Sequence, residues 1–207
     1  HLHTPFVTTV HDLSHLVCPH FQKQVNIHSL SSGLEFSEKV NSRYISDSHS
    51  TKQQMVQLMG VPSHRIDVIH LACDRQHFQP STDCSLRQRL LNKYKIPDQP
   101  FMLSVGTKEP RKNLLGAVRA YRKMREKYPD TPIQFVIAGG DGWGNQQQLK
   151  KVIQNTPGVH PIGYVENDDL PTLYSAASFF VYVSYYEGFG LPCLLYTSPS
   201  PRDGTSS

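Results

Sequence analysis

The sequence lacks the features of several large classes of protein. No stretch of its 207 residues approaches the roughly 20 consecutive apolar residues that a membrane-spanning helix needs. None of the four cysteines stands in a Cys-x-x-Cys pair, which argues against a disulfide framework and against a structural zinc site. The eleven histidines are scattered, and none forms a His-x-x-x-His pair on a segment with a helical pattern. We therefore expect no bound metal and a reducing, cytoplasmic environment.

Charge and composition narrow the possibilities further. The net charge is only +4, and most basic residues between 111 and 127 are interpreted as the solvated face of one helix. No arginine-rich arm is present, so nucleic acid is not an expected partner. With 38% hydrophobic and 10% aromatic residues, the chain is expected to be globular rather than disordered. It starts at His1 without an initiator Met, a basic n-region or an apolar h-region, so no signal peptide is predicted and both ends are interpreted as truncated.

Apolar runs alternate with amphipathic segments beyond residue 100. Residues 101–105, 133–138 and 179–183 are apolar almost throughout, which predicts buried strands, and residues 113–128 repeat apolar side chains at helical spacing. This alternation is typical of an α/β fold whose parallel sheet is covered on both faces. Before residue 100, strands are predicted at 6–10, 43–46 and 65–70, and helices at 51–59, with Ser50 as the cap and Gly60 as the end, and at 85–94.

Two prolines suggest where the chain divides. Pro97 and Pro100 lie in a short linker, so we predict a first domain at residues 1–95 and a second at 96–192. Residues 193–207 have neither helical period nor strand alternation, and they resemble the translation of a sequencing-library adapter. We predict a non-native tail that makes few contacts with the core; the alternative is a natural tail rich in Ser and Pro.

Three glycine-containing segments follow predicted strands, where ligands bind in doubly wound sheets. In residues 106–113 a glycine ends a strand, and Arg111 and Lys112 stand where a helix is predicted to begin. Two cations beside free N–H groups suit a diphosphate, although basic residues at helix starts are also common on plain surfaces.

The other two segments follow later strands. Residues 139–144 do not have the spacing of the dinucleotide fingerprint, and we predict a tight turn with an aromatic plug; a nicotinamide-dependent oxidoreductase is kept as a minor alternative. In residues 187–190, the Glu187 carboxylate can bind sugar hydroxyls and the glycines can offer bare N–H groups. The alternative for Glu187 is a surface carboxylate with no ligand.

Together these motifs resemble glycosyltransferase family 4, whose members have the GT-B fold of two facing Rossmann-like, parallel-sheet domains. Both domains are expected to be incomplete here. The resemblance rests on several segments in the family's order, namely residues 10–13, 46–48, 62–80, 109–113, 163–165, 169–174 and 186–192.

The resemblance implies roles for individual residues. Lys112, aided by Arg111, would neutralise the nucleotide diphosphate in place of a metal ion, and Glu187 would contact the transferred sugar. His11 would approach the sugar from the first domain, and Val165 would meet the base through its main chain. The remaining residues of the predicted donor site are Gly106, Thr107, Tyr164, Gly188, Phe189 and Gly190.

Two positions depart from the family's pattern. Many members carry Arg where this chain has Thr107, and Arg111 is expected to compensate in part. The second glutamate of the family's Glu-x7-Glu motif should stand at position 195, where this chain has Leu195, so its ribose contact is missing. A catalytically inactive, nucleotide-sugar-binding relic is therefore the competing hypothesis.

The resemblance also implies an activity. The intact enzyme would transfer a sugar, with mannose as the first candidate, from a nucleotide sugar to a glycan or lipid-linked acceptor with retention of configuration. No metal cofactor is expected. The expected location is the cytoplasm, with peripheral association at the inner face of the membrane as an option. The sequence leaves open the donor, the acceptor and the oligomeric state.

Overall fold

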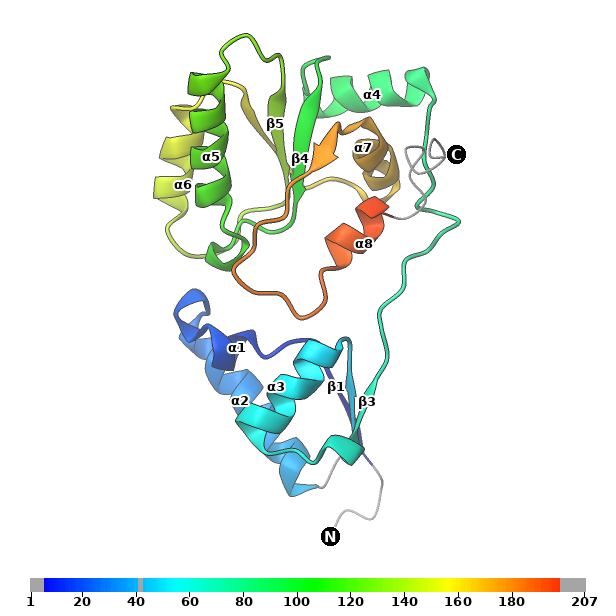
Figure 1. Ribbon diagram of the computed structural model, residues 1–207, viewed down its shortest axis with the longest axis vertical. Helices are drawn as coiled ribbons and strands as arrows, with labels where there is room; N and C mark the ends of the chain where they lie inside the picture. Colours follow the sequence, from blue (N-terminus) through cyan, green and yellow to red (C-terminus); the bar gives the residue numbers. More distant parts are fainter. Residues whose placement is uncertain (1–5, 41–42, 198–207) are drawn as a thin grey trace. The chain divides into compact units, whose positions relative to one another are not determined.

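A computed structural model describes residues 6–40 and 43–197 (Figure 1). The chain forms two compact units. The first extends to Ala72 and includes the separate segment Tyr186–Gly190; the second extends from Cys73 to Tyr185 and resumes at Leu191. Within the described ranges, no helix has both the length and the apolar character needed to cross a membrane.

The first unit contains a parallel sheet of three strands in the order β1-β2-β3. These strands are Val7–Val10, Arg43–Ser46 and Ile66–Val68, close to the predicted ranges. Helices after β1 and β2 return the chain to the amino ends of the sheet, so the three strands run parallel and their carboxyl ends lie at the same edge. His11, Asp47 and His70 lie just beyond these ends.

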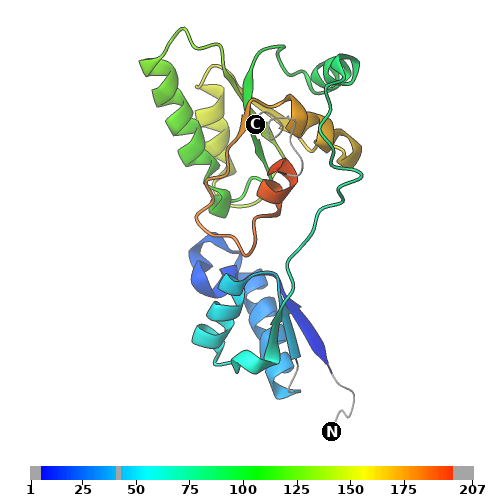
Figure 2. The same ribbon diagram turned by 45° about the vertical axis from the view of Figure 1, so that its right-hand side comes forward.

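Helices cover one side of this sheet, as both ribbon views show (Figures 1 and 2). They are the short α1 (Ser14–Val17), α2 (Gln24–Lys39) and α3 (His49–Met59). Tyr44 of β2 and Met55 of α3 are fully buried in the core, and Leu34 of α2 packs against the same cluster. The predicted cap of α3 was two residues too late: Ser48, not Ser50, accepts a hydrogen bond from the Thr51 N–H at 3.0 Å. Gly60 ends α3 in the left-handed conformation, as predicted.

The second unit contains a parallel sheet of four strands in the order β6-β5-β4-β7. Apolar residues on both faces of the central strands form two separate cores. The strands are β4 (Phe101–Val105), β5 (Gln134–Ala138), β6 (Val159–Gly163) and β7 (Phe179–Phe180), and the helices are α4 (Cys84–Tyr94), α5 (Leu114–Lys127), α6 (Gln146–Gln154), α7 (Leu170–Ala176) and α8 (Leu191–Thr197).

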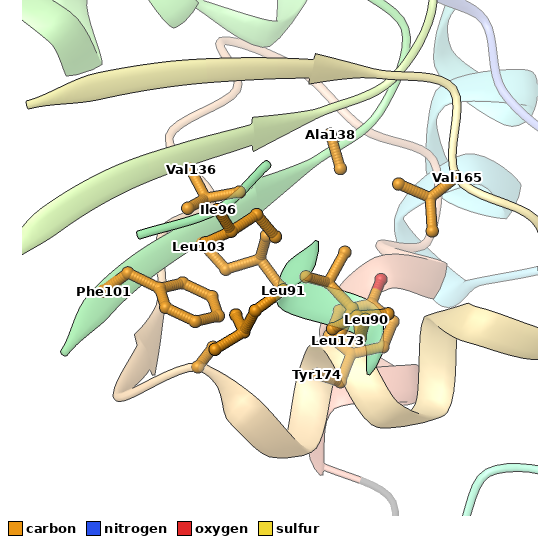
Figure 3. Close-up of a cluster of buried hydrophobic side chains, with 11 residues drawn as sticks. Leu90, Leu91, Ile96, Phe101, Leu103, Val136, Ala138, Val165, Leu173 and Tyr174 are labelled. Atoms are coloured by element: carbon orange, nitrogen blue, oxygen red, sulfur yellow. The ribbon is translucent and has the colours of Figure 1, made fainter. Parts of the chain in front are cut away.

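The residues of β4 alternate between these two cores. Met102 packs with α5 and α6 on one face, whereas Phe101 and Leu103 pack with α4 and α7 on the other. Figure 3 shows the second cluster, in which side chains from β4 and β5 point toward Leu173 and Tyr174 of α7. The continuous apolar pattern of these strands therefore correctly predicted a parallel sheet buried on both faces.

The division between the units comes earlier than the predicted boundary at residues 95 and 96. Leu90 and Leu91 of α4 are buried in the core of the second unit, together with Ile96 and Phe101. Since α4 contributes to that core, the prolines at 97 and 100 form a bend within the second unit and do not separate two domains.

The strand predicted at residues 179–183 is also shorter and less buried than expected. Only Phe179 and Phe180 have strand geometry, and they pair with Met102 and Leu103 of β4. Phe179 is 42% exposed. Beyond Phe180, the Val181 N–H still donates to the Leu103 carbonyl of β4 at 2.8 Å, whereas the Tyr185 N–H donates to the Arg111 carbonyl at 2.9 Å.

The predicted separation of residues 193–207 from the fold is wrong for its first part. Residues 193–197 lie in α8, and Leu195 and Tyr196 pack against the core cluster of Figure 3. The apolar side chains of this segment pack beside α7. The segment is too short to show a helical period in the sequence, so this packing was not predicted. The non-native origin of the segment stays a prediction, and residues 198–207 lie outside the described residues.

Candidate active site

In the second unit, the loop after β4 brings three of the predicted residues together. Gly106 has φ 147°, which favours glycine, and a Cβ there would come within 3.7 Å of the Lys112 side chain. Arg111 and Lys112 lie in a 3₁₀ turn, Pro110–Lys112. The α-helix begins only at Leu114, after Asn113 in the left-handed conformation, so the two cations precede the helix and do not form its first turn. Thr107 is exposed on the same loop.

A buried lysine fastens this loop to the loop after β5. Lys108 is only 8% exposed, and its Nζ donates to the Gly139 carbonyl at 2.7 Å and lies 3.1 Å from Asp141 Oδ1. Hydrogen bonds from Lys150 and Lys108 lower the pKa of the Asp141 carboxyl. The turn at residues 139–144 is thus held by a charged contact as well as by its glycines, which the sequence did not predict.

The Arg111 side chain is not oriented as the motif predicted. Its Nη2 lies 2.8 Å from Glu109 Oε1, and both side chains are largely buried. A guanidinium whose charge is already balanced by a buried carboxylate is a weaker phosphate ligand than one that faces solvent. The expected compensation for Thr107 by Arg111 is therefore not supported by this geometry, and Lys112 becomes the principal candidate cation.

Lys112 contacts a tyrosine that the sequence did not single out. Its Nζ lies 3.2 Å from the Tyr182 hydroxyl and 5.2 Å from the centroid of the Tyr182 ring. Asn113 Nδ2 also donates to the Val183 carbonyl at 3.2 Å. The segment beyond β7 therefore runs beside the 3₁₀ turn and helps to fix the position of the lysine.

Tyr164 and Val165 follow β6, the outer strand of the same sheet. The Val165 side chain is 5% exposed and belongs to the core cluster of Figure 3, whereas the Tyr164 side chain is 66% exposed. The Gly139 N–H donates to the Gly163 carbonyl at 2.6 Å and connects this segment to the loop after β5. Since the Val165 side chain is buried, only its main chain can serve a ligand at the surface.

In the first unit, His11 is paired with a carboxylate that the sequence analysis missed. His11 Nδ1 lies 2.7 Å from Asp47 Oδ2; the His11 side chain is 72% exposed, whereas that of Asp47 is 4% exposed. A carboxylate can only accept a hydrogen bond, so Nδ1 carries the proton and Nε2 is left to face outward. The signal was present in the sequence, because His11 and Asp47 both follow strands of one parallel sheet.

The glycine-rich segment Tyr186–Gly190 packs in the first unit. A Cβ on Gly188 would lie 2.1 Å from the His11 carbonyl oxygen, so the predicted residues His11 and Gly188 are in direct contact. The Gly188 carbonyl accepts a hydrogen bond from the Ser48 hydroxyl at 2.6 Å. Phe189 lies against the His70 ring with centroids 5.9 Å apart, and Glu187 and Gly190 are half-buried beside them.

The comparison with known families assigns the fold. Residues 87–195, more than half of the chain, match the family described as glycosyl transferases group 1. The chain belongs to this family. The resemblance inferred from the motifs is thereby confirmed, and the two Rossmann-like units are those of the GT-B fold.

One curated relative and two solved structures are similar to most of the chain. O-antigen chain mannosyltransferase B of Escherichia coli is 34% identical over 194 residues, which cover 91% of this chain and 49% of the relative. The crystal structure of Anabaena HepE in complex with UDP and glucose has a TM-score of 0.74 at 19% identity, over 94% of this chain and 50% of that one. WaaG, a glycosyltransferase involved in lipopolysaccharide biosynthesis, has a TM-score of 0.69 at 15% identity, over 93% of this chain and 54% of that one.

The chain thus spans about half the length of the curated group 1 relative that it matches at 34% identity. Family membership explains why chemistry-bearing residues gather at the carboxyl ends of both sheets, where doubly wound folds bind ligands. Asp47 and His70 lie in segments that carried the resemblance but were given no role there, and Tyr182 lies outside those segments.

Proposed function

We propose that this chain is part of an enzyme that transfers mannose from a nucleoside-diphosphate mannose to a glycan or lipid-linked acceptor, with retention of configuration. The observation that carries the proposal is the 34% identity with an O-antigen chain mannosyltransferase over 91% of this chain. Relatives at 28% identity named serotype-specific mannosyltransferase WbdA support the same sugar.

The geometry of the second unit supports a diphosphate leaving group. Negative charge develops on the leaving phosphate during transfer, and a fixed cation placed there lowers the barrier. Lys112 is assigned this role, with Arg111 contributing at longer range. The rest of the donor site would be formed by Gly106, Thr107, Tyr164 and the main chain of Val165. The structures of HepE with UDP and with UDP-glucose support a nucleotide sugar as the donor class.

The residues of the first unit are assigned to the transferred sugar. The Glu187 carboxylate would accept hydrogen bonds from sugar hydroxyls, and Gly188, Phe189 and Gly190 would offer N–H groups. His11, held in one tautomer by Asp47, would present Nε2 to a hydroxyl of the sugar or acceptor.

The direct test is transfer itself. The enzyme that contains this chain is incubated with nucleoside-diphosphate mannose and a mannan-type or lipid-linked acceptor, and the product is analysed by mass spectrometry and by NMR of the new glycosidic bond. Mannose in the product with the anomeric configuration of the donor supports the proposal. Hydrolysis without transfer, or an inverted linkage, would contradict it.

We also propose that transfer needs no divalent metal. A fixed cation at Lys112 can take the place of a metal beside the diphosphate. Asp169 is otherwise engaged, since its Oδ2 lies 2.6 Å from Lys93 Nζ and accepts from the Tyr94 hydroxyl at 2.7 Å. Turnover is expected to be unchanged by EDTA in a steady-state assay, and loss of activity that manganese restores would overturn this proposal.

A second candidate, a nucleotide-sugar-binding protein without catalytic activity, is favoured by one observation. Leu195 stands where the family's second glutamate is expected, and it packs against the core of the second unit. A leucine there cannot hydrogen-bond a ribose.

Replacing Leu195 by glutamate tests whether position 195 lies where a ribose contact is made. In a calorimetric titration of the chain with nucleoside-diphosphate mannose, Leu195→Glu is expected to bind about tenfold more tightly than the unaltered chain, since it adds a charged hydrogen-bond acceptor. Leu195→Gln is the control, because glutamine has nearly the same shape as glutamate and carries no charge. Equal affinities of all three proteins would show that position 195 makes no ribose contact.

A further inference from the structure

Tyr182 and Lys112 form a contact that the roles assigned above do not use. The Lys112 ammonium lies 3.2 Å from the Tyr182 hydroxyl oxygen and 5.2 Å from the ring centroid. These two distances place the ammonium at the hydroxyl end of the side chain and away from the centre of the ring. The hydrogen bond, in which the ammonium donates and the hydroxyl accepts, is therefore the main interaction.

The Tyr182 ring is itself held in place by other rings. It stacks on Phe180 with centroids 5.8 Å apart and planes inclined by 21°, and Phe180 stacks on Tyr196 of α8 at 5.3 Å and 24°. Phe180 also lies edge-on to Tyr174, which is buried in the core of Figure 3. A series of aromatic contacts thus connects the core of the second unit to the Tyr182 hydroxyl.

The backbone around both residues is fixed on the same side. The Tyr185 N–H donates to the Arg111 carbonyl at 2.9 Å, and Asn113 Nδ2 donates to the Val183 carbonyl at 3.2 Å. The segment beyond β7 is consequently joined to the 3₁₀ turn at three successive residues, 111, 112 and 113. Only the middle contact, that of Lys112, is made by a charged group.

We propose that Tyr182 is a positioning residue that holds the Lys112 ammonium in its phosphate-binding orientation before the donor arrives. This inference rests on the proposed function, because it takes Lys112 as the diphosphate ligand. A lysine side chain has four rotatable bonds, and a ligand that must order them loses affinity. In the proposed role, the hydrogen bond to the Tyr182 hydroxyl orders these bonds when the unit folds, so that phosphate binding does not have to order them.

The test uses inorganic pyrophosphate, which carries the charge of the diphosphate without base or sugar. Its affinity for the 207-residue chain is measured by calorimetry for the unaltered protein and for Tyr182→Phe. The loss of one hydrogen bond to a charged group is expected to weaken binding about fivefold to tenfold. Tyr128→Phe is the matched control, because Lys127 Nζ lies 5.3 Å from the Tyr128 ring on an exposed helix end; its affinity is expected to be unchanged.

A double-mutant cycle separates positioning from a general structural effect. In a Lys112→Met background, Tyr182→Phe is expected to cause no further loss, since the hydroxyl acts only through the ammonium. A further loss there, or unchanged or tighter binding in Tyr182→Phe alone, would overturn the positioning role and leave the proposed function intact. No binding of pyrophosphate or of GDP and UDP by the unaltered chain would overturn both.

Discussion

Lys112→Ala is expected to lower the turnover of the enzyme that contains this chain by about 100-fold or more, as measured in a steady-state transfer assay. Charge develops on the leaving diphosphate in the transition state, and removal of one preorganised donor to such a charge typically has an effect of about this size. Lys112 is the cation of the loop after β4 whose position best suits this role, because Arg111 is paired with the buried Glu109 and Lys108 is paired with Asp141.

The control is a lysine of the same unit with no part in the site. Lys150 is unsuitable, since its Nζ lies 3.0 Å from the Asp141 carboxylate that holds Lys108. Lys123 is exposed on α5, and Lys123→Ala is expected to leave turnover unchanged. Similar losses in Lys112→Ala and Lys123→Ala would show that the phosphate assignment is wrong.

Gly139→Ala is expected to lower the free energy of unfolding by about 3 kcal/mol. Gly139 has φ 136°, a conformation that side chains rarely adopt, and its Cβ would lie 2.0 Å from the Gly106 carbonyl oxygen. The two loops would have to separate, and the hydrogen bonds of Lys108 to the Gly139 carbonyl and of the Gly139 N–H to Gly163 would be strained.

The neighbouring glycine supplies the matched control. A Cβ on Gly140 would meet nothing within 4 Å, so Gly140→Ala is expected to stay within about 1 kcal/mol of the unaltered chain. Urea unfolding can be followed by the fluorescence of Trp143, the single tryptophan, which lies in the same loop. Equal stabilities of the two variants would mean that the loops do not make the close approach described here.

Much of the second unit could be predicted because its sequence patterns are local. The apolar runs of β4 and β5 follow directly from burial on both faces, and the boundaries of β4 match the predicted ones. The proline of α7 lies in its first turn, where a missing N–H costs little.

The predictions of the domain boundary and of the strand after residue 178 were wrong because both depend on contacts between residues far apart in the sequence. Leu90 and Leu91 belong to a core most of whose other members lie beyond residue 100, so the prolines at 97 and 100 gave a misleading boundary. The last backbone hydrogen bond of the segment after residue 178 to β4 is that of the Val181 N–H, and the Tyr185 N–H donates to the Arg111 carbonyl beside the 3₁₀ turn. No local sequence pattern predicts either the burial of α4 in the second unit or the early end of this strand.

The candidate site shows the same division. Lys112 stands in a recognisable motif, and its loop follows β4 as predicted. Glu187 and its neighbouring glycines also stand in a motif, but the segment Tyr186–Gly190 belongs to the first unit and not to the predicted second domain. Asp47 and Tyr182 were given no role because each contacts a partner 36 or 70 residues away in the sequence. The role of Arg111 stays a prediction, and the structure adds that Glu109, two residues before it, lies within hydrogen-bond distance of its guanidinium.

The contact of Lys108 with the loop after β5 has a consequence for the energetics of ligand binding. Lys108 Nζ, its N–H and its carbonyl all bond to that loop or to Gln146 at the start of α6. The loops after β4 and β5 therefore become ordered together when the unit folds, and their conformational entropy is lost at that stage. A diphosphate that binds beside them does not have to order either backbone, so its affinity depends mainly on the few side chains that still move.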